Sequence, residues 1–192
     1  MKKFIILILL NVMWSGVVFA QNMQVIGGSS YARDCYHAST AAALTGSASR
    51  VDVENCDNAL HYGGLKKRDL IATYVNRGVV HMAMENFTDA ANDYNKALEL
   101  NPKVAEAYVN RGNLWFMVNR YKEAIEDYGQ SLELGFAQTH IALLNRGMVH
   151  EITGSFVMAK DDYIKALTHK SEWPIAKQKL ERVNKKIIKR DG

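Results

Sequence analysis

The sequence has none of the short motifs that identify common catalytic and ion-binding sites. A glycine-rich phosphate loop, a nucleophilic serine elbow, an HExxH zinc motif and a calcium-binding loop are all missing from it. The only adjacent carboxylates, Glu126-Asp127 and Asp161-Asp162, point in different directions if they are helical. We therefore expect a protein that is not an enzyme and that uses no cofactor and no metal.

Residues 1–20 have the order of features found in a secretory signal peptide. Two lysines precede an apolar stretch, which is followed by small residues ending at Ala20. We expect cleavage after Ala20 and an exported protein, periplasmic or secreted, that begins at Gln21. The alternative is a retained membrane anchor, but the apolar stretch is interrupted by polar and small residues and is short for a span.

A strong net charge is also lacking. The sequence has 24 Lys and Arg against 20 Asp and Glu, and loss of residues 1–20 would remove two lysines and leave a net charge of +2. Residues 177–192 alone contribute +5, from seven basic and two acidic side chains. The rest of the mature chain, at about −3, lacks the basic surface of a nucleic-acid-binding protein.

One pentapeptide recurs at a fixed distance along the chain. YVNRG occupies residues 74–78 and again 108–112, and NRG returns at 145–147. Residues 71–104 laid over 105–138 without a gap match at eleven of 34 positions, and a third copy begins at His140. A fixed period of 34 residues indicates a repeat architecture.

Small and aromatic residues stand at the same offsets in the three copies, and the pattern resembles the tetratricopeptide repeat family. The resemblance implies an all-α fold, a right-handed α-solenoid of antiparallel helix pairs, with repeats at 71–104, 105–138 and 140–173. The usual proline near the end of each repeat is kept only in the first copy, as Pro102. The residues that carry the resemblance are Gly78, Gly112 and Gly147; Phe87, Tyr121 and Phe156; Ala90, Ala124 and Ala159; and Tyr94, Tyr128 and Tyr163.

Each copy divides into two stretches with helical spacing, joined by a short polar turn. The recurring glycine lies inside the first helix, where it costs about 1 kcal/mol relative to alanine. We expect close approach of the paired helix, at Ala90, Ala124 and Ala159, to compensate for this cost.

The antiparallel pairing also places specific charges opposite each other, because residues equidistant from the turn lie at the same level. An arginine and an aspartate sixteen residues apart are centred on each turn. We therefore predict an ion pair within each repeat, worth about 0 to 1 kcal/mol if it is partly exposed. The three predicted pairs are Arg77 with Asp93, Arg111 with Asp127, and Arg146 with Asp162.

Residues 21–68 contain a linker and what resembles a degenerate fourth helical hairpin. Cys35 and Cys56, the only cysteines, are equidistant from its turn. An even cysteine count in an exported protein favours a disulfide. The alternatives are two free thiols or a metal site completed by His37 and His61.

We expect residues 174–192 to form a capping helix. Proline is tolerated at the start of a helix, as at Trp173-Pro174, and the residues that follow have one apolar stripe on an otherwise basic surface. The alternative is weak attraction of residues 177–190 to anionic lipid or wall polymer.

By resemblance, the first helix of each repeat lines a concave face that binds extended segments of other proteins. Asn76, Asn110 and Asn145 recur on this face, where their amides suit the backbone of a bound peptide. The alternative is that they bond only to neighbouring repeats. The lysines and arginines with which some family members clamp a C-terminal carboxylate are missing, so we do not predict recognition of chaperone tails. The other predicted groove residues are Val79, Met82, Asn113, Phe116, Met117, Met148 and Ile152.

These observations favour a protein-protein interaction module that acts as an adaptor in a cell-envelope assembly. The runner-up is an envelope-associated structural protein that uses its basic C-terminal helix. An accessory subunit of an enzyme is a third possibility, which the sequence does not separate from the first. Self-association is a further option, since the short solenoid has two open ends.

Overall fold

The computed structural model describes residues 23–24 and 30–191, so the expected signal peptide lies outside the described residues. The described part folds into nine helices and no strand, which confirms the predicted all-α class. The helices are α2 (Ser30–Thr45), α3 (Arg50–Tyr62), α4 (Lys67–Ala83), α5 (Phe87–Leu100), α6 (Ala105–Met117), α7 (Tyr121–Glu133), α8 (Thr139–Ile152), α9 (Phe156–His169) and α10 (Pro174–Asp191).

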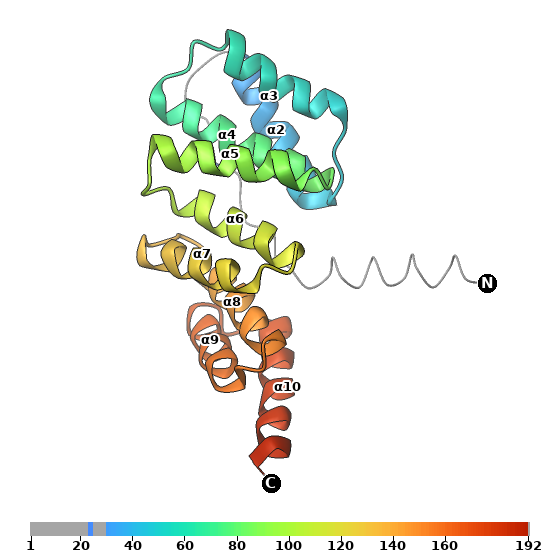
Figure 1. Ribbon diagram of the computed structural model, residues 1–192, viewed down its shortest axis with the longest axis vertical. Coiled ribbons are helices and arrows are strands. Elements are labelled where there is room, and N and C mark those ends of the chain that lie inside the picture. The colour runs from blue at the N-terminus through green and yellow to red at the C-terminus, as the bar shows by residue number, and fades with distance from the viewer. Residues whose placement is uncertain (1–22, 25–29, 192) are drawn as a thin grey trace, which may run out of the picture.

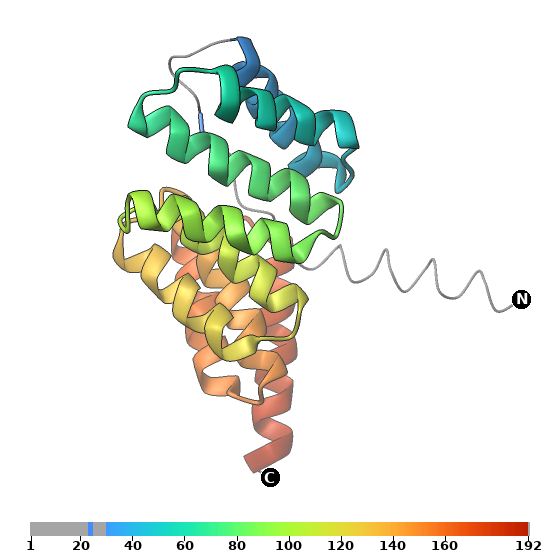
Figure 2. The same ribbon diagram turned by 45° about the horizontal axis from the view of Figure 1, so that its top comes forward.

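Consecutive helices form antiparallel pairs that stack along the long axis of the molecule (Figure 1). The pair α2-α3 lies at one end, and α4-α5, α6-α7 and α8-α9 follow in chain order. Helix α10 has no paired helix after it within the described residues and closes the other end (Figure 2). This arrangement is the predicted solenoid, with three repeats between an N-terminal hairpin and a C-terminal helix.

The turn inside each repeat has the same backbone geometry. Its central residue is left-handed, with φ of 60° at Glu85, 60° at Asn119 and 78° at Gly154. The next amide then donates to a carbonyl five residues back, as in the 2.9 Å bond from Asn86 N to His81 O. Together these bonds form a Schellman motif, which satisfies the last carbonyls of the first helix and reverses the chain.

Each recurring glycine lies under a tyrosine ring of the second helix. A Cβ atom added at Gly112 would be 2.8 Å from Cε1 of Tyr128, and one at Gly147 would be 2.7 Å from Cε1 of Tyr163. Gly78 meets Tyr94 in the same way. The predicted compensation at Ala90, Ala124 and Ala159 is therefore corrected: those alanines are buried, but the close contact with glycine is made by the tyrosines.

We expect Gly112→Ala to destabilise the protein by up to about 2 kcal/mol in denaturant unfolding. Overpacking a tight contact typically costs about 1 to 3 kcal/mol, and the better helix propensity of alanine offsets about 1 kcal/mol of that. Gly129→Ala in α7 is the matched control, because its added Cβ would meet only Arg146 Nη1, at 3.8 Å. That variant should be more stable than wild type by up to about 1 kcal/mol. Equal effects at the two sites would contradict the tight contact.

A disulfide between Cys35 and Cys56 joins α2 to α3. Both cysteines are fully buried, and α2 contributes mostly small residues to the cluster around them, including Ala32, Ala38 and Ala42. Closing a loop of this length stabilises a protein by about 3 kcal/mol in the chain-entropy model. The crosslink therefore reinforces the hairpin whose core is poorest in large apolar side chains.

Candidate functional site

One arginine–aspartate pair bridges the two helices in each of the three repeats. The Arg111 guanidinium donates from Nε to Oδ2 of Asp127 at 2.7 Å and from Nη2 to Oδ1 at 2.8 Å. The same two-bond geometry joins Arg77 to Asp93, at 2.9 and 2.6 Å, and Arg146 to Asp162, at 2.9 and 2.7 Å. The aspartate side chains are only 3 to 7% exposed, so these are buried pairs and the small value of a surface ion pair does not apply to them.

Burial dominates the electrostatics of the first pair. It raises the pKa of Asp93, although the hydrogen bonds from Arg77 act in the opposite direction. The Nε2 atoms of His81 and His150 lie 3.9 Å from Asp93 and Asp162, and burial lowers the pKa of His150. These histidines are packed between helices beside structural carboxylates.

Two of the arginines also reach back to the preceding helix pair. Nη1 of Arg77 donates to Asp57 of α3 at 2.6 Å, and Nη1 of Arg111 donates to Asn95 of α5 at 2.7 Å. These acceptors could not be predicted from the repeat pattern, because they belong to the preceding helix pair and differ in residue type. The arginines thus connect successive repeats as well as the two helices within each.

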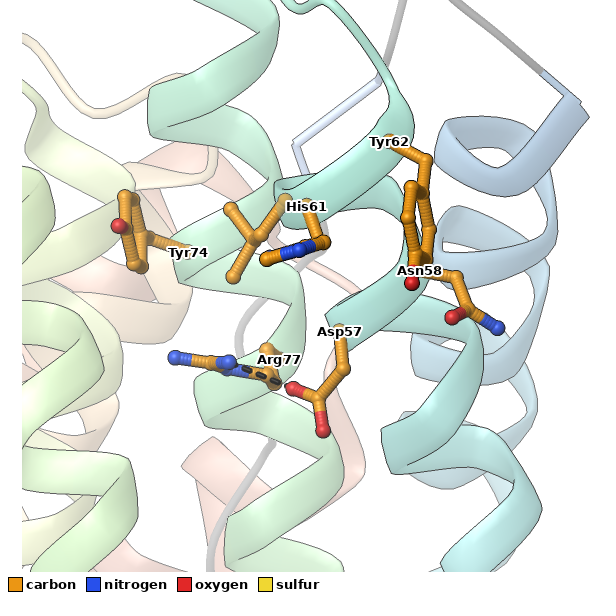
Figure 3. A pocket seen from close by; sticks show the side chains of 7 residues that line it. Asp57, Asn58, His61, Tyr62, Tyr74 and Arg77 are labelled. Carbon is orange, nitrogen blue, oxygen red and sulfur yellow. Dashed lines mark hydrogen bonds and ion pairs between the residues drawn. The ribbon is translucent and has the colours of Figure 1, made fainter.

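A pocket lies beside the first of these contacts, between α3 and α4 (Figure 3). Figure 3 shows Asp57 and Arg77 joined by their ion pair, with His61 and Tyr74 close by. The two charged groups of the pocket, Asp57 and Arg77, already bond to each other, so we do not regard it as the candidate site.

The asparagine at the recurring inner position makes its clearest contact in the first repeat. The main-chain N–H of Met23 donates to Oδ1 of Asn76 at 3.1 Å, and Nδ2 of Asn76 donates to the Met23 carbonyl at 3.0 Å. The two residues are 53 positions apart. One side-chain amide therefore satisfies both polar groups of one residue in a separate, non-helical segment.

The side chain of Met23 packs on an apolar cluster between the first two repeats. The cluster contains Ile71 and Val75 of α4, Val104, and Ala107 of α6, with Tyr74 and Tyr108 at its edge. Met23 itself is half-buried. The inner face at the first repeat thus offers the Asn76 amide, which hydrogen-bonds both backbone groups of one residue and which we call the clasp. Beside it lies an apolar surface that contacts the side chain of that residue.

The corresponding asparagines of the next two repeats differ from Asn76. Asn145 donates from Nδ2 to Oδ1 of Asn113 at 2.9 Å, and the Tyr128 hydroxyl donates to the same oxygen at 2.8 Å. Asn145 therefore joins neighbouring repeats, as in the alternative interpretation of the sequence. Asn110 is only 3% exposed, and its Nδ2 has no hydrogen-bond partner in the described structure.

Helix α10 covers the inner face of the third repeat. Leu144 and Met148 share a buried cluster with Ala176 and Val183 of α10. The prediction of Met148 as open groove surface is therefore wrong, because the capping helix buries it. Ile152 remains about half exposed.

A buried carboxylate fixes this helix in place. Glu151 receives two bonds of 2.7 Å from Arg182 and one of 2.8 Å from Lys186, both on α10, and one of 3.0 Å from the Tyr163 hydroxyl. Burial opposes ionisation of Glu151, but these donors outweigh it and lower its pKa to about 2.

The remaining predicted groove residues are less open than expected. Val79 packs with α2 residues, and Met82 lies in the cluster around Tyr94, so both are buried. Phe116 and Met117 of α6 are only partly buried. The candidate site is therefore the inner face of the first two repeats, centred on Asn76 and Asn110.

The described residues include neither a metal-binding cluster nor a membrane-spanning helix. No group of three or more His, Cys, Asp and Glu side chains there could hold a metal ion. Within the same residues, no helix combines the length and the apolar character needed to cross a membrane.

Comparison with known proteins agrees with this architecture. A tetratricopeptide repeat model matches residues 75–138. Residues 75–138 therefore have the sequence of tetratricopeptide repeats. No curated protein sequence matches it.

Solved structures similar to this chain have the same fold at low sequence identity. The crystal structure of MamA has a TM-score of 0.65 and 20% identity, over 82% of this chain and 86% of MamA. The first repeat domain of Spaghetti (RPAP3), bound to the HSP90 peptide SRMEEVD, has a TM-score of 0.59 and 18% identity over 62% of this chain and 93% of that domain. The second repeat domain of human RPAP3, in complex with the HSP70 peptide SGPTIEEVD, gives 0.54 and 21% over 58% and 92%.

Proposed function

We propose that this protein is an exported interaction module, which binds an extended segment of a partner protein along the inner face of its first two repeats. In this role it is an adaptor in a cell-envelope assembly. The observation that carries the proposal is the clasp of Asn76 on the backbone of Met23, at 3.0 and 3.1 Å. Export rests on the expected signal peptide at residues 1–20.

The chemistry of the clasp suits recognition of a backbone. An asparagine amide supplies one acceptor and two donors, so it matches the N–H and C=O of one extended residue whatever its side chain. At the same position of the next repeat, the buried Nδ2 of Asn110 is an unused donor, which is costly unless a partner accepts from it. A segment that passes both repeats would satisfy both amides.

The similar structures support peptide binding. The inner face of this chain, however, suggests a ligand different from the peptides bound in those structures. The two RPAP3 domains are described as bound to peptides that end in EEVD. The inner face of this chain offers Val75, asparagines and the partly buried Phe116 and Met117 instead of a lysine and arginine clamp. We therefore propose a partner segment with apolar side chains.

The test is capture of envelope proteins by the mature form, residues 21–192, which retains every described residue. The double variant Asn76→Ala, Asn110→Ala should lose the specific partner, while Asn92→Ala, an exposed asparagine on α5, should retain it. Loss of the two bonds of Asn76 alone should weaken binding of the identified segment roughly tenfold to thirtyfold, at about 1 kcal/mol for each bond. Equal recovery by all three proteins, with unchanged helicity and melting temperature, would refute the groove as the binding site.

The runner-up function, attachment through the basic face of α10, is less well supported. Arg182 and Lys186 both point to Glu151, and Lys177 bonds to Glu172 at 2.9 Å. Several positive charges of the helix are therefore already paired. The dependence of binding on ionic strength distinguishes the two functions. Attachment through α10 should weaken steeply as ionic strength rises, and groove binding should not.

A further inference from the structure

We propose that the chain's own Met23 is a resident ligand of the groove, which a partner must displace. This inference rests on the proposed function. It adds that Met23 competes with the partner for Asn76, and that the partner residue bound by Asn76 should be of a particular type. It is carried by the contacts of Met23, because Met23 uses the groove as a bound peptide would.

The polar contacts do not depend on the identity of the bound side chain. Met23 contributes only its N–H and C=O, and both go to Asn76. Any residue except proline can supply this pair of groups, since proline has no N–H. Asn76 is fully buried, so departure of the segment would leave its amide in need of another partner.

The apolar contact determines which residues fit best at the clasp. The Met23 side chain rests on the cluster of Ile71, Val75, Val104 and Ala107. Methionine is flexible and fills irregular apolar surfaces, and a leucine or isoleucine could make similar contacts. The partner residue clasped by Asn76 should therefore be apolar and should not be proline.

The resident segment leaves part of the inner face unused. Met23 satisfies Asn76, but Asn110 keeps a buried Nδ2 without a partner in the described structure. Neighbouring helices are about 8 to 10 Å apart, and an extended strand rises about 3.3 Å per residue, so the two asparagines are about three residues apart along a ligand. A partner could place an apolar residue against Asn76 and, about three residues away, a carbonyl that accepts from Nδ2 of Asn110. It would then make one hydrogen bond more than Met23 does.

Met23 competes with added ligands because it belongs to the same chain as the groove. A covalently tethered ligand can have an effective concentration in the millimolar range. An untethered segment with the same contacts must compete against that concentration. A change at Met23 weakens the resident contact and leaves Asn76 intact, so it should strengthen binding of a ligand added in solution.

The first measurement is hydrogen exchange at the Met23 amide in the mature form, residues 21–192. We expect the Met23 N–H to exchange at least tenfold more slowly than in an unstructured peptide, to lose this protection in Asn76→Ala, and to keep it in Asn92→Ala. Fast exchange in the wild type would overturn the proposal, and so would protection that survives Asn76→Ala. The NMR signals of the Asn76 side-chain amide in Met23→Pro provide a readout that does not require changing Asn76, and they should shift.

The second measurement is binding of a labelled peptide with residues 21–27, QNMQVIG, to the mature form. We expect Met23→Pro to bind it at least tenfold more tightly than wild type, and Met23→Ala, which keeps the N–H, to fall in between. A peptide with proline in place of methionine should not bind. Equal affinity of wild type and Met23→Pro would overturn the resident ligand. If the groove variants still lose an envelope partner in that case, the proposed function stands and only this inference fails.

Discussion

Replacement of Arg111 by methionine is expected to lower the free energy of unfolding by about 3 to 5 kcal/mol at pH 7. Arg111 makes two hydrogen bonds to Asp127, whose side chain is only 7% exposed. The variant would leave a buried carboxylate without its counter-charge, which typically costs that much. The second repeat is the clearest place for this test, because it has Trp115 where the other repeats have a histidine near the aspartate.

The double variant Arg111→Met, Asp127→Leu is the matched control for this prediction. It removes both charges and should recover most of the loss, since apolar replacement of a buried pair is often neutral. Urea unfolding of both variants and the wild type at pH 7 measures these differences. A cost below about 1 kcal/mol would mean that the pair behaves as an exposed surface ion pair.

A fall in pH through the range from about 4.5 to about 2 is expected to remove about 2 to 3 kcal/mol of stability that depends on Glu151. Its pKa is about 2 in the folded protein, compared with an ordinary value of 4.5. Because the folded pKa is the lower one, the contribution is complete above about pH 4.5 and is lost as the pH falls toward 2. Arg182 and Lys186 are about half exposed, so solvent screening places the effect at the lower end of this range.

The variant Glu151→Gln isolates this contribution from the other carboxylates. Glutamine keeps an acceptor for Tyr163, Arg182 and Lys186 but carries no charge. We expect the variant to be less stable than wild type by about 2 to 3 kcal/mol at pH 7 and to equal it near pH 2. The two stabilities should be measured by denaturant unfolding across this range. A difference that does not change with pH would mean that shape, and not ionisation, explains the role of Glu151.

The register of the arginine–aspartate pairs and of the disulfide could be predicted because both depend on local geometry. Two helices joined by a short turn place residues equidistant from that turn at the same level. Arg111 and Asp127, and likewise Cys35 and Cys56, lie at such positions and are joined in the structure. How deeply the aspartates are buried could not be predicted in the same way, because it depends on how the repeats stack.

The candidate groove was only partly predictable for the same reason. The repeat pattern placed Asn76, Asn110 and Asn145 on one inner face. Their partners come from segments that no repeat rule describes: Met23 lies 53 residues before Asn76, and Asn145 bonds to Asn113 of another repeat. The burial of Met148 likewise depends on where α10 packs.

By itself, the sequence determined the repeat, the helix pairs and the positions that face each other within a pair. These features follow from a period of 34 residues and from short turns, which act over short distances along the chain. Only the tertiary structure decided which inner positions stay available. That outcome depends on contacts between residues far apart in sequence, namely Met23 on Asn76 at one end and α10 on Glu151 at the other. Repeats with the same local pattern therefore differ in what they leave for a ligand, because the ends of the chain cover the inner face of the first and third repeats differently.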